Sequence, residues 1–272
     1  MKQGSKQLGK AFLGLALGLV WLIPFYLMLT NSFKTKQEIF TNPLKFPEAF
    51  TFENYPEAFR QLDFIQTLAN SLLITVSSVI IIVIFSAMAA YALERIKSKF
   101  STVTFMVFVA AMLVPFQSVM IPLVALFGKA QMLNQIGIIF MYLGFGGSMS
   151  IFLYHGAMKS IPRALDEAAI IDGASRWQVF WKVIFPMLKP TTVTVAVLNT
   201  MWIWNDYLLP SLVINSPTTQ TIPLKMFFFF GQYTKQWHLA LAALVIAILP
   251  VIIFYFFMQK QIIKGVADGA VK

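Results

Sequence analysis

Cysteine is absent from this 272-residue chain, and charged residues make up only 12% of it. Without cysteine, the chain can form neither disulfides nor thiolate metal sites. A soluble domain carries about 25% charged residues, whereas 58% of this chain is hydrophobic. The two shortages together exclude an ordinary soluble domain and indicate an integral membrane protein.

Six stretches lack Asp, Glu, Lys and Arg for most or all of the length that a helix needs to cross a bilayer, about 20 residues. The fifth reaches that length only if it continues past Asp206. These runs are too uniformly apolar for β-barrel strands, so an all-α, polytopic membrane protein is predicted. Its six transmembrane helices are expected at 11–33, 66–93, 102–127, 136–158, 190–212 and 238–259, in a single domain over 1–272.

Positive charge is distributed unevenly between the segments that join these spans. If the N-terminus is cytoplasmic, two thirds of the 21 Lys and Arg residues fall on the inner side. The positive-inside rule then predicts that both termini are cytoplasmic in a protein that spans the lipid bilayer. The net charge of +10 is a signal of this topology, and no soluble face remains to bind nucleic acid.

The polar segment 160–189, here called the 160–189 loop, interrupts the apolar chain between the fourth and fifth spans. Ser160 is predicted to cap a short helix that has Pro162 in its first turn. Gly173 falls where a left-handed residue would end that helix. The apolar face of this helix is predicted to hold Ile161, Leu165, Ala168 and Ala169.

A second amphipathic helix is predicted to follow the glycine. Ser175 and Gln178 have the spacing of a capping box, and Pro186 is expected to end the helix before the fifth span. Its apolar stripe is predicted to hold Trp177, Phe180, Trp181 and Ile184. Two short helices that meet at a glycine form a bent, rigid element, with one face under the spans and the other free to enter a partner's groove.

An alternative is that these helices lie on the lipid surface. Interfacial helices favour Lys and Arg on the polar face, whereas here Asp166, Glu167 and Asp172 are predicted to share that face. Because an anionic inner leaflet would repel these acids, a protein partner is the better interpretation.

The pattern Glu167-Ala168-Ala169-x3-Gly173-x9-Val183-x-Phe185-Pro186 resembles the EAA loop of ABC importer permeases. The family has Ile and Leu where this chain has Val183 and Phe185. The resemblance implies a coupling helix that docks into a cleft on a separate ATPase subunit, with the glutamate pairing with a basic residue and the two alanines allowing close approach. The ATPase-coupling residues expected on this basis are Glu167, Ala168, Ala169, Asp172, Gly173, Trp177 and Pro186.

Further segments resemble carbohydrate importer permeases of the maltose and multiple-sugar group: Pro24–Lys34, Phe52–Tyr55, Trp204–Pro210 and the maltose-G-type tail Gln261–Lys272. The resemblance implies the type I importer permease fold and half of a translocation pathway. It also implies a homologous second permease subunit, two ATPase subunits and an extracytoplasmic sugar-binding protein as partners. One departure is the stretch 144–147, which is glycine-rich where many relatives carry proline.

Asp206 is the one acid predicted well inside a span, which makes it a candidate for function. Aromatic and amide neighbours would suit a sugar, but the carboxylate could instead cap or pair a neighbouring helix. Prolines in the third span and glycines in the fourth are typical of broken helices that line a pathway, or of ordinary close packing. The substrate-pathway candidates are Trp202, Asn205, Asp206, Gln117 and Gly146.

The sequence contains no G-x-x-x-x-G-K-[ST] nucleotide motif, and His155 and His238 have no companion at metal-ligand spacing. No catalytic residue, metal or cofactor is therefore expected in this chain, and ATP and Mg would be bound by the partner ATPase subunits. The alternative function is an ion-coupled secondary transporter of small polar solutes. That function needs coupling-ion sites near the midplane, for which Asp206 is the sole candidate.

Overall fold

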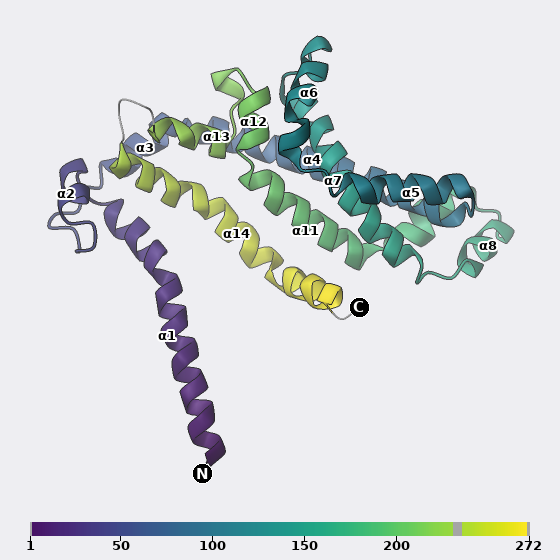
Figure 1. The fold of residues 1–272 in the computed structure, drawn as a ribbon, viewed down its shortest axis with the longest axis horizontal. Helices are drawn as coiled ribbons and strands as arrows, with labels where there is room; N and C mark the ends of the chain where they lie inside the picture. Colours follow the sequence, from purple (N-terminus) through teal and green to yellow (C-terminus); the bar gives the residue numbers. More distant parts are fainter. Residues whose placement is uncertain (1, 231–235, 271–272) are drawn as a thin grey trace. The chain divides into compact units, whose positions relative to one another are not determined.

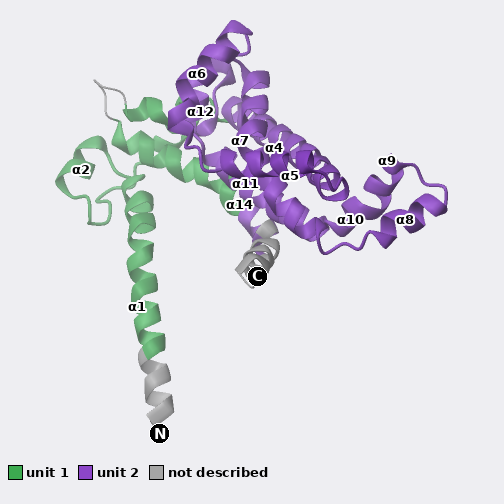
Figure 2. Ribbon diagram, turned by 45° about the vertical axis from the view of Figure 1, so that its right-hand side comes forward, with its two compact units in different colours: residues 1–64, 225–253 green, residues 65–224, 254–272 purple. Residues whose placement is uncertain are grey.

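The computed structural model describes the backbone of residues 2–230 and 236–270, and the side chains of 10–230, 236–257 and 259. Every regular element in these ranges is a helix (Figure 1), as the predicted all-α fold class requires. The side chains of the tail Gln261–Lys272 lie outside the described residues. The predicted single domain contains two compact units, residues 1–64 with 225–253 and residues 65–224 with 254–272 (Figure 2).

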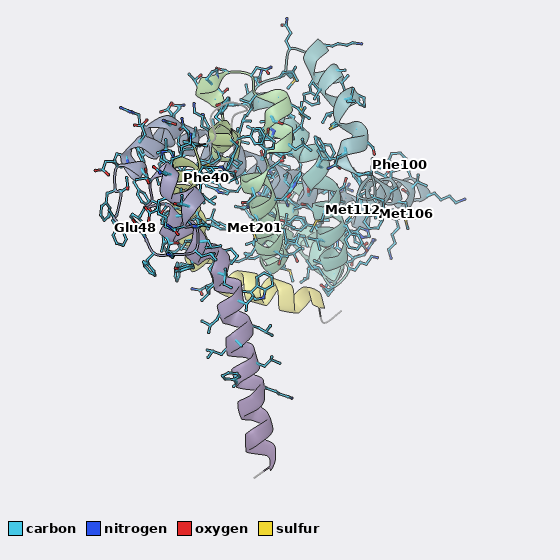
Figure 3. The ribbon with its side chains drawn as sticks, turned by 60° about the vertical axis from the view of Figure 1, so that its left-hand side comes forward. Phe40, Glu48, Phe100, Met106, Met112 and Met201 are labelled. Atoms are coloured by element: carbon cyan, nitrogen blue, oxygen red, sulfur yellow. The ribbon has the colours of Figure 1, made fainter. Side chains whose placement is uncertain are left out.

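Four long apolar helices and two bent helix pairs account for up to six membrane spans. The long helices hold the apolar segments Lys10–Asn31, Phe64–Arg95, Gln135–Met158 and Trp237–Phe257. The bent pairs are Lys99–Ala111 with Phe116–Lys129, at 105°, and Arg176–Met187 with Lys189–Asn205, at 76°. Many apolar side chains on these helices point away from the protein, including Phe100 (79% exposed) and Met106 (58% exposed) (Figure 3). Such outward faces suit a lipid environment.

The first unit is built from the N-terminal helix, the segment that follows it and the start of the last helix. Its helices are α1 (Lys2–Asn31), α2 (Lys36–Thr41), α3 (Asn54–Leu62), the 3-10 helix η3 (Phe227–Phe230) and the first part of α14 (Trp237–Ala270). The core of the unit is formed by small and aliphatic residues of α3 and α14, among them Ala58, Leu62, Ala240 and Ala243.

A buried lysine orders the segment after α1. Lys34 is fully buried, and its Nζ donates to Asn31 Oδ1 at 3.0 Å and to the Asn42 carbonyl at 2.8 Å. Burial lowers the pKa of Lys34, while the nearby Glu38 carboxylate opposes that shift. The Asn54 amide donates to the carbonyl of Lys34 at 2.9 Å. The segment is therefore folded around the end of α1 by hydrogen bonds rather than left as a loose loop.

The second unit carries the remaining helices. They are α4 (Phe64–Arg95), α5 (Lys99–Ala111), α6 (Phe116–Lys129), α7 (Gln135–Met158), α8 (Ala164–Ile171), α9 (Arg176–Gln178), the π-helix η1 (Val179–Ile184), α10 (Phe185–Met187), α11 (Lys189–Asn205), α12 (Leu208–Val213), the 3-10 helix η2 (Pro217–Thr219) and α13 (Ile222–Met226). Helix α7 packs against α5, α11 and α12. The predicted kink of the third span is a full break before Pro115, because a residue that precedes proline avoids the helical region.

Close packing at Gly146 joins three helices of this unit. A Cβ at that position would collide with Asn199 Oδ1 of α11 and would lie 2.8 Å from Ile82 Cδ1 of α4. The Asn199 amide donates to Ser150 Oγ at 3.1 Å, so the buried polar atoms satisfy one another. A glycine is required here because the backbone of α7 approaches its neighbours closely.

The predicted fifth span, 190–212, is not one continuous helix. Helix α11 ends at Asn205, and Asp206 takes an extended conformation before α12 begins at Leu208. Asp206 Oδ1 accepts the Leu208 amide at 2.9 Å. The side chain therefore stabilises the start of a new helix, which is why the span breaks at this residue.

Candidate coupling site

The first helix of the 160–189 loop begins later than the sequence suggests. Ser160 does not cap it: the Ser160 hydroxyl donates to the Ala157 carbonyl at 2.7 Å, and α8 starts at Ala164 after Arg163. The Ile161 carbonyl, which could have started a longer helix, instead accepts two hydrogen bonds of 3.3 Å from the Arg95 guanidinium. A long-range contact thus replaces the predicted local cap.

The buried face of α8 also differs from the predicted one. Ile161 is buried and Ala169 is half-buried, but Leu165 and Ala168 are exposed. The side chain that α8 buries is Asp166, which is 8% exposed. The prediction that Asp166 shares the polar face with Glu167 and Asp172 is therefore wrong, since only the latter two are exposed.

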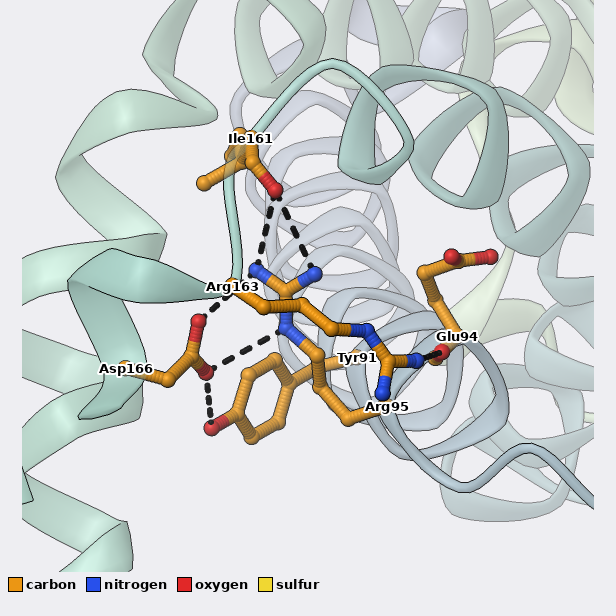
Figure 4. A network of polar contacts seen from close by, with 6 residues as sticks. All are labelled: Tyr91, Glu94, Arg95, Ile161, Arg163 and Asp166. Carbon is orange, nitrogen blue, oxygen red and sulfur yellow. Dashed lines mark hydrogen bonds and ion pairs between the residues drawn. The ribbon is translucent and has the colours of Figure 1, made fainter.

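Asp166 lies in a polar cluster at the C-terminal end of α4 (Figure 4). Tyr91 Oη donates to Asp166 Oδ1 at 2.7 Å, and Arg95 Nη2 lies 2.8 Å from Asp166 Oδ2. The neighbouring Arg163 donates to the Glu94 carbonyl at 2.6 Å. We call Tyr91, Arg95 and Asp166 the α4–α8 clamp. Sequence reasoning missed it, although Tyr91 and Arg95 stand four residues apart on one helix face.

The turn after α8 has the predicted geometry. Gly173 has φ +86°, in the left-handed region that favours glycine. The Ala174 amide donates to the Ala169 carbonyl at 2.9 Å and closes the end of the helix. The predicted capping box is also present: Ser175 Oγ accepts the Gln178 amide, and Gln178 Oε1 accepts the Ser175 amide at 2.8 Å.

The second half of the loop is a wider helix than expected. Val179–Ile184 form a π-helix, with the Phe185 amide bonded to the Phe180 carbonyl. The helix ends at Met187, one residue after Pro186, which agrees with the predicted end before the fifth span. The chain turns at Leu188, after Met187.

The predicted aromatic stripe divides into a buried and an exposed part. Phe180 and Ile184 are buried, and the Phe180 ring lies 5.4 Å from that of Tyr91 on α4. Trp181 is half-buried, whereas Trp177 is 60% exposed. One side of the helix is thus fixed to the unit, and Trp177 stays exposed.

The exposed surface of the loop combines acids with apolar side chains. Glu167 and Asp172 are exposed, Ile170 is 50% exposed and Ile171 is 85% exposed. Sequence reasoning did not select the two isoleucines, which follow the alanine pair directly. The same loop holds a groove of about 370 Å³, lined by Ala169, Asp172, Gly173, Ala174, Gln178, Lys182 and Val183. The exposed surface of the loop therefore includes both apolar side chains and carboxylates.

The structure brings only some of the predicted pathway residues together. Tyr142 Oη donates to Asp206 Oδ2 at 2.9 Å, and the Trp202 ring packs edge-on against Tyr142 at 5.3 Å. The Asn205 amide bonds the Met201 carbonyl within its own helix. These contacts favour the structural alternative for Asp206, because both of its oxygens accept hydrogen bonds from this chain.

Of the other two candidates, Gly146 lies one helical turn after Tyr142 on α7, and Gln117 lies on a different helix, α6. Gln117 is exposed in the first turn of α6, and Gly146 is buried against Asn199 and Ile82. Within the described residues, no three His, Asp or Glu side chains are placed to hold a metal ion.

A helical chain with four to six apolar spans and a bent polar loop defines a polytopic membrane protein. Within that class, residues 82–268 match the family of the binding-protein-dependent transport system inner membrane component. The match covers more than half of the chain, which therefore belongs to this family. The resemblance to carbohydrate ABC importer permeases, stated from the motifs, is confirmed.

Two relatives are similar to this chain over almost its whole length. The probable starch degradation products transport system permease protein AmyC of Thermoanaerobacterium thermosulfurigenes is 57% identical, over 96% of this chain and 95% of the relative. The multiple sugar-binding transport system permease protein MsmG of Streptococcus mutans is 36% identical, over 94% and 93%.

A solved structure resembles the fold. It is that of a bacterial ABC transporter involved in the import of the acidic polysaccharide alginate, with a TM-score of 0.79 and 24% identity over 96% of this chain and 97% of the matched chain. At this identity the likeness shows the fold alone, and that fold is the predicted type I importer permease fold.

Proposed function

We propose that this chain is a permease subunit of a binding-protein-dependent ABC importer for sugars. It forms half of the translocation pathway and couples it to a separate ATPase through the 160–189 loop. The observation that carries the proposal is the exposed loop surface at Glu167 and Ala168, ended by the left-handed Gly173, in a chain whose relatives are named as sugar permeases.

The loop surface has the chemistry of a docking element. Ile170 and Ile171 supply apolar area for a cleft, and Glu167 supplies a carboxylate for a basic residue at the rim of that cleft. Ala168 leaves the backbone of α8 open to close approach. Gly173 and Trp177 fix and extend the same surface, while Pro186 lies near the turn into α11. Nucleotide-driven closure of the ATPase pair would displace this element and rock the spans between inward-open and outward-open states.

The partners follow from this role. A homologous second permease completes the pathway, two ATPase subunits bind ATP and Mg, and an extracytoplasmic binding protein delivers the sugar. This chain supplies neither a cofactor nor a catalytic residue. Its place is the inner membrane, with both termini and the 160–189 loop in the cytoplasm.

The first sugars to test are short glucose oligomers of the kind released from starch, because the 57% identical relative is named for starch degradation products. This chain is co-expressed with the products of its neighbouring genes, and the complex is purified and reconstituted in liposomes. ATP-dependent uptake of maltotriose, raffinose and melibiose is then measured. Co-purification of an ATPase and ATP-dependent uptake support the proposal. Uptake by this chain alone down an ion gradient would instead establish the secondary-transporter alternative.

A further inference from the structure

Helix α4 is held to the 160–189 loop at one end. The α4–α8 clamp joins the Asp166 carboxylate to Tyr91 and Arg95, and the side chains of Arg95 and Asp166 are only 13% and 11% exposed (Figure 4). Arg163 adds a bond of 2.6 Å to the Glu94 carbonyl. Because the ion pair is shielded from water, separating α8 from α4 would leave charges buried without partners.

The other end of α4 is held to the segment between α12 and α13, residues 214–221. The Asn70 amide donates to the Thr218 carbonyl at 2.9 Å and to the Gln220 carbonyl at 3.0 Å. Ser71 Oγ accepts the Ile222 amide at 2.9 Å. Both α4 residues are buried, at 5% and 3% exposure, so these bonds are also protected from water.

Between these two attachments α4 is unbroken. Its 32 residues contain neither proline nor glycine, the usual causes of a kink. The other long helices each contain one or both, for example Pro24 in α1 and Pro250 in α14. From Asn70 to Arg95 the helix rises ~38 Å at 1.5 Å per residue, more than the ~30 Å of bilayer hydrocarbon. The two attachments therefore lie on opposite sides of the membrane.

We propose that α4 is a strut that links the 160–189 loop to residues 214–221, with Asp166 as the positioning residue at its inner end. This inference rests on the proposed docking of an ATPase to the loop. A displacement of α8 is passed to the outer segment as a movement of one stiff helix, because α8 and the outer segment are each bonded to it. Coupling of this kind is reciprocal, so a ligand on the outer segment also alters nucleotide affinity at the ATPase.

The strut assigns different tasks to two adjacent acids. Asp166 faces α4 and transmits movement, whereas Glu167 faces outward and contacts the ATPase. Asp166→Asn removes the charge but keeps the size of the side chain, and Glu167→Gln is its matched comparison. The first variant is expected to keep ATPase co-purification and lose transmission. The second is expected to lose co-purification.

Transmission can be measured at the outer end because the chain has no cysteine. Asn215→Cys places a single thiol on the exposed part of the outer segment. In the complete complex, its maleimide labelling rate is compared with and without a non-hydrolysable ATP analogue. We expect the nucleotide to change the rate about tenfold in this parent, within the usual range of allosteric coupling. Asp166→Asn and Asn70→Ala should each reduce the change to less than about twofold.

Two further variants separate transmission from folding. Pairing Asp166→Asn with Arg95→Gln should restore the nucleotide response, because a neutral amide pair leaves no unpaired buried charge. Tyr91→Phe removes only one hydrogen bond and should lower the response partly, which keeps the test open if Asp166→Asn fails to fold. Val76→Ala on the same helix, at a residue that is 51% exposed, should keep the full response.

The proposal that α4 is a strut is overturned if an ATPase co-purifies and the Asp166→Asn variant responds to nucleotide as the parent does. It is also overturned if the parent shows no nucleotide response, or if Asp166→Asn loses co-purification as Glu167→Gln does. Failure of any ATPase to associate with the parent chain refutes the proposed function itself, so the two failures are distinguishable.

Discussion

Two buried charges of this protein, Lys34 and Asp166, are satisfied in different ways. The Lys34 ammonium bonds acceptors only three to nine residues away in sequence, two of them backbone carbonyls. The Asp166 carboxylate bonds Arg95 and Tyr91, 71 and 75 residues away. The lysine therefore fixes the shape of one segment, whereas the aspartate joins two elements. A charge with nearby partners builds a fold locally, and one with distant partners can transmit a movement.

The largest effect is expected from removing the distant partner of Asp166. Arg95→Met leaves a carboxylate shielded from water without its ion pair, which should lower the free energy of unfolding by about 3 kcal/mol. The measurement is thermal or chemical unfolding in detergent, with the exposed Arg176→Met as a matched control. An equal loss of unfolding free energy in the control would show that the Arg95–Asp166 ion pair makes no specific contribution to stability.

Lys34→Met should have a smaller effect, about 2 kcal/mol, because it removes charge-assisted bonds to the Asn31 side chain and to backbone carbonyls. The exposed Lys36→Met provides the comparison. Protease sensitivity should rise only around residues 35–53, since the bonds are local. Increased cleavage in the 160–189 loop would contradict the local role of this lysine.

Gly173→Ala should cost about 1 kcal/mol, since the left-handed conformation at φ +86° strains a residue with a Cβ. A methyl group there meets no atom within 4 Å, so strain is the whole effect. Gly156→Ala, inside α7 and likewise open, should instead be neutral or stabilising. Unfolding curves of the two variants decide this, and a stabilised Gly173→Ala would show that the turn is not strained.

The smallest effect is expected at the exposed pair Arg60 and Glu57, where Arg60→Met should leave thermal stability unchanged. A hydrogen bond from Gln61, and then the Arg60 charge, lower the pKa of Glu57 below 4.5. Its contribution is therefore present above pH 4.5 and is lost as the pH falls through the lowered pKa. A pH titration of Glu57 followed by NMR should show the pKa rise in Gln61→Leu, and an unchanged value would exclude the bond.

The features of the 160–189 loop that the sequence predicted correctly are the local ones. The left-handed turn at Gly173 and the capping box of Ser175 with Gln178 each depend only on residues close together in the sequence. The direction of Asp166 was mispredicted because the rotation of α8 is set by Tyr91 and Arg95, which periodicity within α8 cannot reveal.

In the membrane helices, too, local features were predicted and long-range contacts were not. Apolar length predicted the spans, and proline predicted a disturbance in the third one. The break of the fifth span at Asp206 was not predicted, although the hydrogen bond from the Leu208 amide is local. The bond from Tyr142 on another helix is the part that the sequence could not reveal. Gln117, Gly146 and Asp206 were selected as pathway candidates by residue type, which carries no information on which helix faces meet.

The π-helix at Val179–Ile184 lets this part of the loop hold one residue more than an α-helix of the same direction would hold. A π turn holds about one residue more than an α turn, and each α-helical residue rotates the chain by about 100°. Deleting one residue there would therefore restore an α-helix and leave Trp177 at nearly the same angle to α11, because the wider and the narrower turn each complete one rotation. A frame-preserving deletion of one codon within Val179–Ile184 should thus preserve the direction of the exposed surface. The same deletion between Asn70 and Arg95 would rotate the two ends of α4 by about 100° against each other.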